Sequence, residues 1–258
     1  MLNDIVYLEV NNGIGTIYFN RANKRNAMNL EMWQLTSDLL DICEKKEDVK
    51  VVIFRGVDET AFSAGADISE FPKYRTGAEN ADRYNRITMD VEAKIKYLSK
   101  PTIALIQGYC IGGGCEIAAA CDFRFSDQTG KFAINSSKVG HVYYLQSAKN
   151  LIDVVGTSHA KDILYSGRLL SAEESYQMGL VNQLWETEEL VDKTYEYAER
   201  IAQNSQYAVQ GTKIVINKII DGYFEETEDV AALILGSFDT DYYKEATNAF
   251  LEKRVKNQ

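Results

Sequence analysis

The apolar positions of the first fifty residues follow two successive patterns. β-Branched and aromatic residues dominate residues 5–10 and 15–20, and the polar Asn-Asn-Gly between these runs is typical of a hairpin turn. Apolar residues then recur every three or four positions from Met32 to Cys43, with Asn29 as a helix cap before them. The sequence therefore predicts a β-hairpin followed by an amphipathic helix.

Strand-like and helical patterns alternate through the middle of the chain. Strands are predicted at 51–56, 101–108, 122–126 and 131–134, and helices over 79–98 and from the glycines at 112–114. Residues 61–76 are dense in small residues and are expected to form a loop. The alternation favours an α/β fold with a mostly parallel sheet, whose strand C-terminal ends are the usual place for a ligand.

The last third of the chain is predominantly helical in pattern. Helices are predicted from Ser171 onward, and the only strand signal among them is Leu-Val-Asn-Gln-Leu-Trp at 180–185. A boundary near residue 186 would divide the chain into a core domain, residues 1–186, and a helical region, residues 187–258. The apolar stripe that includes Leu190, Val191, Tyr195 and Ala198 must be buried against another element.

Charge and composition narrow the classes of partner. The 258 residues carry a formal net charge of −10 with a pI near 4.9, which disfavours nucleic acid and requires a local cationic patch for any anionic ligand. The amino terminus lacks the pattern of a signal peptide, and no apolar run reaches membrane-spanning length. We therefore expect a soluble, cytoplasmic protein without a membrane partner.

The cysteines and histidines do not form a metal-binding pattern. Cys43, Cys110, Cys115 and Cys121 include no Cys-x-x-Cys pair, and the two histidines do not extend them into a ligand motif. Buried free thiols and no bound metal are the prediction.

Two segments rich in small residues carry the candidate chemistry, Ala-Phe-Ser-Ala-Gly-Ala-Asp at 61–67 and Gly-Tyr-Cys-Ile-Gly-Gly-Gly-Cys-Glu at 108–116. Small residues let a ligand reach backbone N–H groups, and two such donors converging on one oxygen form an oxyanion hole. Glu116 lies one helical turn after Gly113, so its carboxylate is placed to face the same pocket. Burial there would raise its pKa toward that of a general acid or base.

Each of these features also has a simpler interpretation. Three consecutive glycines are more often a tight turn or a packing device, and a glutamate in a first helical turn often only interacts with the helix dipole. The segment lacks the Lys-Ser or Lys-Thr of a phosphate-binding loop and the complete Gly-x-Gly-x-x-Gly of a dinucleotide-binding turn. Both nucleotide-binding alternatives are therefore discounted.

Several segments together resemble the crotonase superfamily, the enoyl-CoA hydratase/isomerase family. They are NRANKRNAMN, AFSAGADI, KPTIALIQGYCIGGGCEIAAACDFR, GRLLSAEESYQMGLVNQL and NAFLEKR, in that order over nearly the whole chain. The resemblance implies a spiral core of repeated ββα turns with C-terminal helices that build a trimer, commonly a dimer of trimers. It also implies acyl-CoA chemistry through a stabilised thioester enolate, with coenzyme A supplied by the substrate and no other cofactor.

The resemblance also assigns residues to roles. Ala66 and Gly113 match the backbone donors of the family's oxyanion hole, and Glu116 matches the first of two catalytic glutamates. Positions matching the family's coenzyme A contacts are Lys24, Arg25, Ala27, Ala64, Asp67, Ile68, Phe250 and Lys253. For Lys24, Arg25 and Lys253, a purely solvated surface role is about as plausible.

The position of the second catalytic glutamate is the main departure from the family, because this chain has Ser136 there. His141, Tyr143 and Tyr144 follow in place of a Pro-Gly-rich turn. In one interpretation Glu116, assisted by Ser136, His141 or a tyrosine, catalyses hydration, dehydration or a double-bond shift. In a second, the enzyme is similar to methylmalonyl-CoA decarboxylase, where Tyr143 matches a tyrosine near the substrate carboxylate. The third, a non-catalytic CoA-binding scaffold, is disfavoured because both loops and Glu116 are intact.

The residues after Ser136 also have structural interpretations. Tyr143 and Tyr144 are also compatible with a place at the rim of the core, and His141 with a structural one. The acyl group is not specified, since the depth of the pocket depends on how residues 79–98 and 136–145 are placed.

Overall fold

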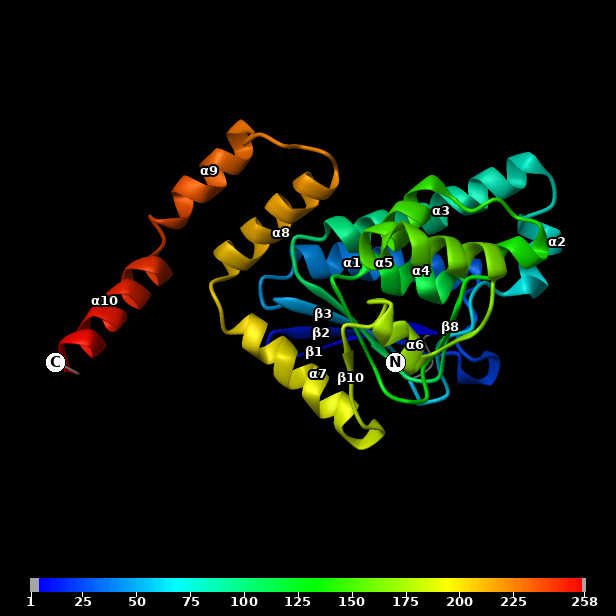
Figure 1. Ribbon diagram of the computed structural model, residues 1–258, viewed down its shortest axis with the longest axis horizontal. Helices are drawn as coiled ribbons and strands as arrows, with labels where there is room; N and C mark the ends of the chain where they lie inside the picture. Colours follow the sequence, from blue (N-terminus) through cyan, green and yellow to red (C-terminus); the bar gives the residue numbers. More distant parts are fainter. Residues whose placement is uncertain (1–4, 257–258) are drawn as a thin grey trace.

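A computed structural model describes residues 5–256 of the chain, and the side chains of residues 5–252 (Figure 1). The larger of its two sheets has six strands in the order β1-β2-β3-β5-β7-β10. These strands are Val6–Asn11, Ile14–Phe19, Val51–Gly56, Thr102–Ile106, Phe123–Ser126 and Gln183–Leu184. β1 and β2 form the predicted antiparallel hairpin, and every other pairing in this sheet is parallel.

The second sheet has four short strands in the order β4-β6-β8-β9. They are Ala61–Ser63, Tyr109–Ile111, Lys131–Ala133 and Leu170–Ser171. β4, β6 and β8 run parallel, whereas β9 is antiparallel to β8. Because β3, β5 and β7 are each followed directly by β4, β6 and β8, every turn of the chain adds one strand to each sheet. This repetition winds the core into a spiral.

The helices that close these turns are α1 to α6. They span Leu30–Lys45, Phe71–Tyr74, Ala78–Tyr97, Gly113–Ala120, Leu145–Ser166 and Ala172–Gln177. Short 3₁₀ helices at Ala22–Lys24, Ile68–Glu70 and Ser136–Val139 lie in the connections. As predicted, α1 begins after Asn29, whose side chain accepts a hydrogen bond from the Met32 N–H. Its buried face, which includes Trp33 and Leu40, packs into the main hydrophobic core with residues of α3, α4 and both sheets.

The other face of the six-stranded sheet is covered by α7, Thr187–Ala202. The stripe of Leu190 and Ala198, fully buried, packs on Ile14, Ile53 and Phe125 of the sheet, with Tyr195 partly buried beside them. The predicted burial of this stripe is thus against the core, although α7 lies beyond residue 186. The division of the chain at that residue stays a prediction.

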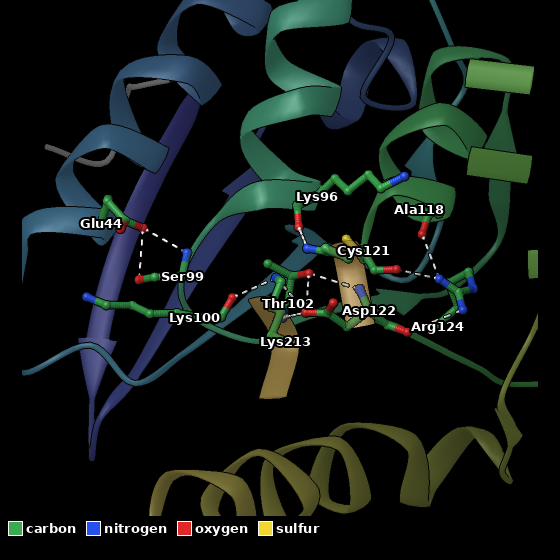
Figure 2. A network of polar contacts seen from close by, with 11 residues as sticks. Glu44, Lys96, Ser99, Lys100, Thr102, Ala118, Cys121, Asp122, Arg124 and Lys213 are labelled. Atoms are coloured by element: carbon green, nitrogen blue, oxygen red, sulfur yellow. Dashed lines mark hydrogen bonds and ion pairs between the residues drawn. The ribbon is translucent and has the colours of Figure 1, made fainter. Parts of the chain in front are cut away.

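The remaining helices, α8 (Gln206–Ile220), α9 (Glu228–Ser237) and α10 (Asp241–Lys256), extend away from the spiral (Figure 1). α8 is held to the body by Lys213, whose ammonium donates to Asp122 Oδ2 at 2.8 Å and to the Lys100 carbonyl at 3.0 Å (Figure 2). Asp122 Oδ2 also accepts from the N–H of Thr102 at 2.7 Å. One carboxylate therefore joins the start of β5 to α8.

A buried arginine completes this network at the end of α4. The Arg124 guanidinium donates to the carbonyls of Ala118 and Cys121 at 3.2 and 2.6 Å (Figure 2). Ala118 lies in the last turn of α4 and Cys121 is its C-cap, so Arg124 binds carbonyl groups at the end of the helix, where intrahelical acceptors run short of donors. Arg124 is 4% exposed and thus places a fixed positive charge at the negative end of that helix.

Four local predictions need correction. Residues 61–76 are not a continuous loop, since they include β4 and α2, and β6 separates β5 from the glycines. There are two sheets rather than one. The segment 145–166, for which no helix was expected, forms the long α5. β4 and β6 are each only three residues long, which is too short for an alternating pattern of apolar and polar residues to reveal them.

The four cysteines are buried and free, as predicted.

Candidate active site

A cavity of about 420 Å³ opens at the C-terminal ends of three parallel strands of the four-stranded sheet. Its wall includes Ala64 to Ala66 after β4, Gly112 and Gly113 after β6, and Ile134 to Ser136 after β8. This is the position at which parallel sheets usually bind ligands. The alternation of strand and helix thus brings the two loops singled out in the sequence to one place.

Glycines let these loops approach one another. Gly65 has φ +93°, and a methyl group on its Cα would lie 2.8 Å from the Ile111 carbonyl oxygen. A methyl group at Gly113 would lie 2.9 Å from the Trp33 ring, and one at Gly114 would lie 2.8 Å from the Ser63 carbonyl oxygen. Such distances are shorter than carbon contacts allow, so side chains at these positions would separate the loops.

Among residues 5–256, several backbone N–H groups of these loops have no backbone acceptor, and those of Ala66 and Gly113 are among them. Two adjacent N–H groups already have acceptors. The Asp67 N–H donates to the Met28 carbonyl at 2.9 Å, and the Gly112 N–H donates to the Ala133 carbonyl at 2.8 Å. Within residues 5–256, the N–H groups of Ala66 and Gly113 donate in none of the hydrogen bonds between these turns and strands. Gly113 is the first residue of α4, where N–H groups have no helical acceptor and the dipole is positive.

Glu116 lies in the first turn of α4 and lines the same cavity. A methyl group at Gly113 would come within 3.7 Å of its Oε2 atom, which places the carboxylate beside Gly113. Burial raises the pKa of Glu116 to about 7, although the charge of Arg75 and a hydrogen bond from the Tyr143 hydroxyl both act to lower it. A carboxyl group with this pKa exchanges protons near neutral pH.

A second carboxyl group, Glu92 of α3, is fully buried behind the cavity. Its Oε1 accepts a hydrogen bond from Ser147 Oγ at 2.9 Å, and its Oε2 has no partner among the described side chains. Burial, reinforced by the charge of Glu116, raises the pKa of Glu92 well above its usual range. Both effects favour the neutral form of Glu92.

The residues expected to assist Glu116 also line the cavity. Ser136 begins the 3₁₀ helix after β8, and Tyr143 and Tyr144 lie just before α5. The ring nitrogen Nε2 of His141 and the Tyr144 hydroxyl are 2.8 Å apart. Burial and the positive charge of Arg75 lower the pKa of His141, so its imidazole is neutral at physiological pH.

The residues predicted to contact coenzyme A fall into three groups. Ala64 and Ile68 line the cavity. Lys24, Arg25 and Ala27 belong to a turn that adjoins it, because the Ala64 N–H donates to the Arg25 carbonyl at 2.9 Å. Arg25 additionally stacks over the Tyr109 ring at 4.9 Å.

The remaining three lie apart from the cavity wall. Asp67 is nearly buried and pairs with Arg21 at 2.6 Å, so it holds the loop rather than facing the cavity. Phe250 is exposed on α10, away from the spiral (Figure 1). Lys253 also belongs to α10, but its side chain lies outside the described residues.

Sequence reasoning missed two charged residues of this region, Arg75 and Glu92. Glu92 lies among Thr88, Val91 and Ile95 on the buried face of α3. A carboxylate within an apolar helical stripe was a signal that could have identified it. Arg75 follows a four-residue helix in a segment without periodicity, and no sequence pattern marks it.

Comparison with known proteins agrees with this arrangement. The family model for enoyl-CoA hydratase/isomerase matches residues 9–257. The chain belongs to the enoyl-CoA hydratase/isomerase family.

Relatives within this family match almost end to end. A crotonyl-CoA hydratase from Syntrophomonas wolfei is 30% identical over 253 residues, which cover 98% of this chain and 96% of that protein. An (E)-benzylidenesuccinyl-CoA hydratase from Thauera aromatica is 33% identical over 256 residues, 97% of each chain. The crystal structure of an enoyl-CoA hydratase/isomerase family protein from Hyphomonas neptunium has a TM-score of 0.94 at 32% identity and covers 98% of this chain and 96% of its own. The predicted family and its α/β spiral fold are confirmed.

Two kinds of feature are absent from the described residues. No helix among them is long and apolar enough to cross a membrane. No group of three or more histidine, cysteine, aspartate or glutamate side chains in residues 5–252 is arranged to hold a metal ion.

Proposed function

We propose that this family member hydrates the double bond of a 2-enoyl-CoA thioester, with Glu116 as the acid/base. The observation that carries the proposal is that Ala66, Gly113 and Glu116 line one cavity, and that within residues 5–256 the N–H groups of Ala66 and Gly113 have no backbone acceptor. Two unpaired donors fit a thioester oxygen that gains negative charge, and an adjacent carboxyl group fits proton transfer at the neighbouring carbons. Hydratases at about 30% identity, including the crotonyl-CoA hydratase, support the same reaction class.

In the proposed reaction the thioester oxygen accepts hydrogen bonds from Ala66 and Gly113. Ionised Glu116 removes a proton from water while the water oxygen bonds to C3, and the electrons of the double bond move to form the enolate. Protonated Glu116 then returns a proton to C2. The product is a 3-hydroxyacyl-CoA, in which the atoms of one water molecule have been added.

The missing second glutamate is accommodated because a single carboxyl group performs both transfers. Its pKa of about 7 lets Glu116 accept and return a proton without a strong preference for either state. The hydrogen bond from Tyr143 orients it, and Ser136 offers a hydroxyl at the position where the family has a second glutamate. Coenzyme A enters as part of the substrate along the turn of Lys24, Arg25 and Ala27, and no further cofactor is required.

We also propose that the chain acts in the cytoplasm as a homotrimer or a dimer of trimers. Support comes from the large apolar side chains exposed on and around α9 and α10. They include Phe224, Leu235, Phe238, Phe250 and Leu251. Exposed apolar surface of this extent is typical of an interface between subunits. Size-exclusion chromatography with light scattering measures the subunit number.

The deciding experiment is turnover of crotonyl-CoA and of methylmalonyl-CoA by the wild-type protein and by Glu116→Gln. Loss of the conjugated thioester absorbance reports hydration, and released CO₂ reports the alternative, a decarboxylase of the methylmalonyl-CoA type. We expect hydration that falls at least ~100-fold in Glu116→Gln. Decarboxylation alone would favour the alternative, and tight CoA binding without either reaction would favour a scaffold. Unchanged turnover by Glu116→Gln would remove this residue from the mechanism.

A further inference from the structure

The cavity contains a cluster of polar side chains that the proposed hydration does not use. We call Arg75, Asn85, His141 and Tyr144 the polar cluster; all four line the cavity. They come from three segments: Arg75 follows α2, Asn85 lies in α3, and His141 and Tyr144 precede α5. Arg75 Nη2 donates to the Tyr144 hydroxyl at 3.3 Å and lies 3.5 Å from Asn85 Oδ1, and Tyr144 is 2.8 Å from His141 Nε2.

Arg75 is the one arginine or lysine among the described residues that line this cavity, and Glu116 is the one carboxylate. The two do not form an ion pair, and within residues 5–252 the guanidinium is within ion-pairing distance of no other carboxylate. Within residues 5–252 its side-chain hydrogen bonds use Nη2, toward the neutral oxygens of Asn85 and Tyr144, whereas a guanidinium has five N–H donors. Arginines with restricted exposure are normally paired, so this one has unused capacity for an anion.

The position of the guanidinium is fixed by two aromatic rings. Arg75 Cζ lies 4.6 Å from the ring centre of Phe71 and 5.2 Å from that of Tyr84. Stacking of this kind limits the rotamers of the side chain before any ligand arrives. A preorganised arginine loses less freedom on binding and therefore contributes more to affinity.

An acyl chain that ends in a methyl group gives these groups nothing to bind. It would remove water from Arg75 and from the His141–Tyr144 pair without replacing the hydrogen bonds, which is costly for a cation. A carboxylate offers the geometry that a guanidinium matches best, two parallel N–H···O bonds, and Asn85 and Tyr144 lie close enough to add to them. On a chain of net charge −10, this cavity is then locally suited to an anionic group.

We propose that the polar cluster binds a carboxylate on the acyl chain, so that the preferred substrates are CoA monothioesters of unsaturated dicarboxylic acids. The inference rests on the proposed function for the place of the thioester, because the thioester at Ala66 and Gly113 directs the acyl chain into this cavity. The carboxylate pairs with Arg75 and takes no part in bond making or breaking. The alternative is that Arg75 only packs on Phe71 and Tyr84 and adjusts the charge of Glu116.

Direct binding measurements distinguish a carboxylate site at Arg75 from a purely packing role of this residue, and they do not require turnover. Isothermal titration calorimetry with succinyl-, glutaryl- and adipyl-CoA, each against the uncharged acyl-CoA of the same carbon number, measures a ratio of Kd values for wild type, Arg75→Gln and Arg75→Lys. We expect at least one dicarboxylic thioester to bind the wild type ~10–100-fold more tightly than its uncharged counterpart, the range for a charge-assisted hydrogen-bonded pair. Arg75→Gln should remove most of that preference, and Arg75→Lys should retain part of it.

The matched control is Arg83→Gln, because Arg83 lies on the exposed side of α3 and pairs with Glu79 at 3.1 Å. It should leave the Kd ratio unchanged. Equal affinity of the wild type for both members of every pair, or a preference that survives in Arg75→Gln, would overturn the inference. If dicarboxylic thioesters bind with the expected preference but no enoyl-CoA of either kind is hydrated, the proposed function fails while the carboxylate site stands. Tyr144→Phe, which keeps the ring, provides a second variant and should weaken the preference less than Arg75→Gln does.

Discussion

The hydrogen bond between Tyr143 and Glu116 provides a quantitative test of the active site. Tyr143→Phe keeps the ring and removes only the hydroxyl that donates to the ionised carboxylate. A hydrogen bond to a charged group is worth ~1.5–3 kcal/mol, and the opening of the cavity to water favours the lower value. Since one pKa unit corresponds to ~1.4 kcal/mol, the pKa of Glu116 should rise by about one unit from its value of about 7.

The sign of the effect on activity follows from the role of the ionised form. A base must be deprotonated to accept a proton from water, so kcat/KM should increase with pH up to a plateau, with a midpoint near 7 in the wild type. In Tyr143→Phe the curve should keep its shape and move to higher pH. At pH 6 the variant should therefore lose about tenfold more activity than it loses on the plateau.

The assay is kcat/KM against pH, followed by absorbance with whichever enoyl-CoA the wild type hydrates. Tyr165→Phe is the control, because Tyr165 lies on α5 with 73% of its surface exposed and does not line the cavity. Its midpoint should equal that of the wild type. A midpoint that stays in place or moves to lower pH in Tyr143→Phe would refute the hydrogen bond as a determinant of the Glu116 pKa.

Three further variants test neighbouring features. Glu92→Gln should leave the midpoint of the pH profile within ~0.3 units, because burial raises the pKa of Glu92 well above its usual range and favours its neutral form, which Gln imitates. A shift of the midpoint to lower pH would mean that Glu92 carries a charge. Gly114→Ala should lower the unfolding free energy measured in urea by ~1–3 kcal/mol, because its methyl group would lie 2.8 Å from the Ser63 carbonyl oxygen. The control Gly211→Ala, which has open space around it, should not destabilise the protein. Asp122→Asn should lower the unfolding free energy by about 3 kcal/mol, because Lys213 would remain buried without its counter-charge. The control Asp48→Asn, at an exposed ion pair, should change the unfolding free energy by less than ~0.5 kcal/mol.

Elements with a regular pattern could be predicted from the sequence, and elements defined by tertiary contacts could not. The cap at Asn29 and the hairpin at residues 11–14 depend on neighbouring residues, so local chemistry was sufficient. β4 and β6 exist because they pair with each other across more than forty residues of chain, which no local pattern records. α5 contains Gly156 at φ +73°, and this interruption breaks the apolar period that would have identified the helix.

The candidate site likewise contains residues that could be predicted from the sequence and residues that could not. Ala66, Gly113 and Glu116 lie in motifs whose spacing suggested a shared cavity, and the structure places all three on its wall. Arg75 follows α2, a helix that the sequence did not predict, and Glu92 lies on the buried face of α3, whose helical pattern was predicted. Their contribution depends on the angle at which α3 crosses α4, a property of packing rather than of residue order.

Arg124 has a consequence for how the enzyme should respond to salt. Its guanidinium lies at the C-terminal end of the same short helix whose first residue, Gly113, lines the cavity, so it offsets the negative pole of α4 at the end away from the cavity. Mobile ions screen charges in water but do not enter the interior where Arg124 lies. Raising the ionic strength should therefore weaken substrate capture by the surface cations Lys24 and Arg25 while leaving kcat nearly constant. We expect an enzyme built in this way to keep its intrinsic rate in media of very different salinity.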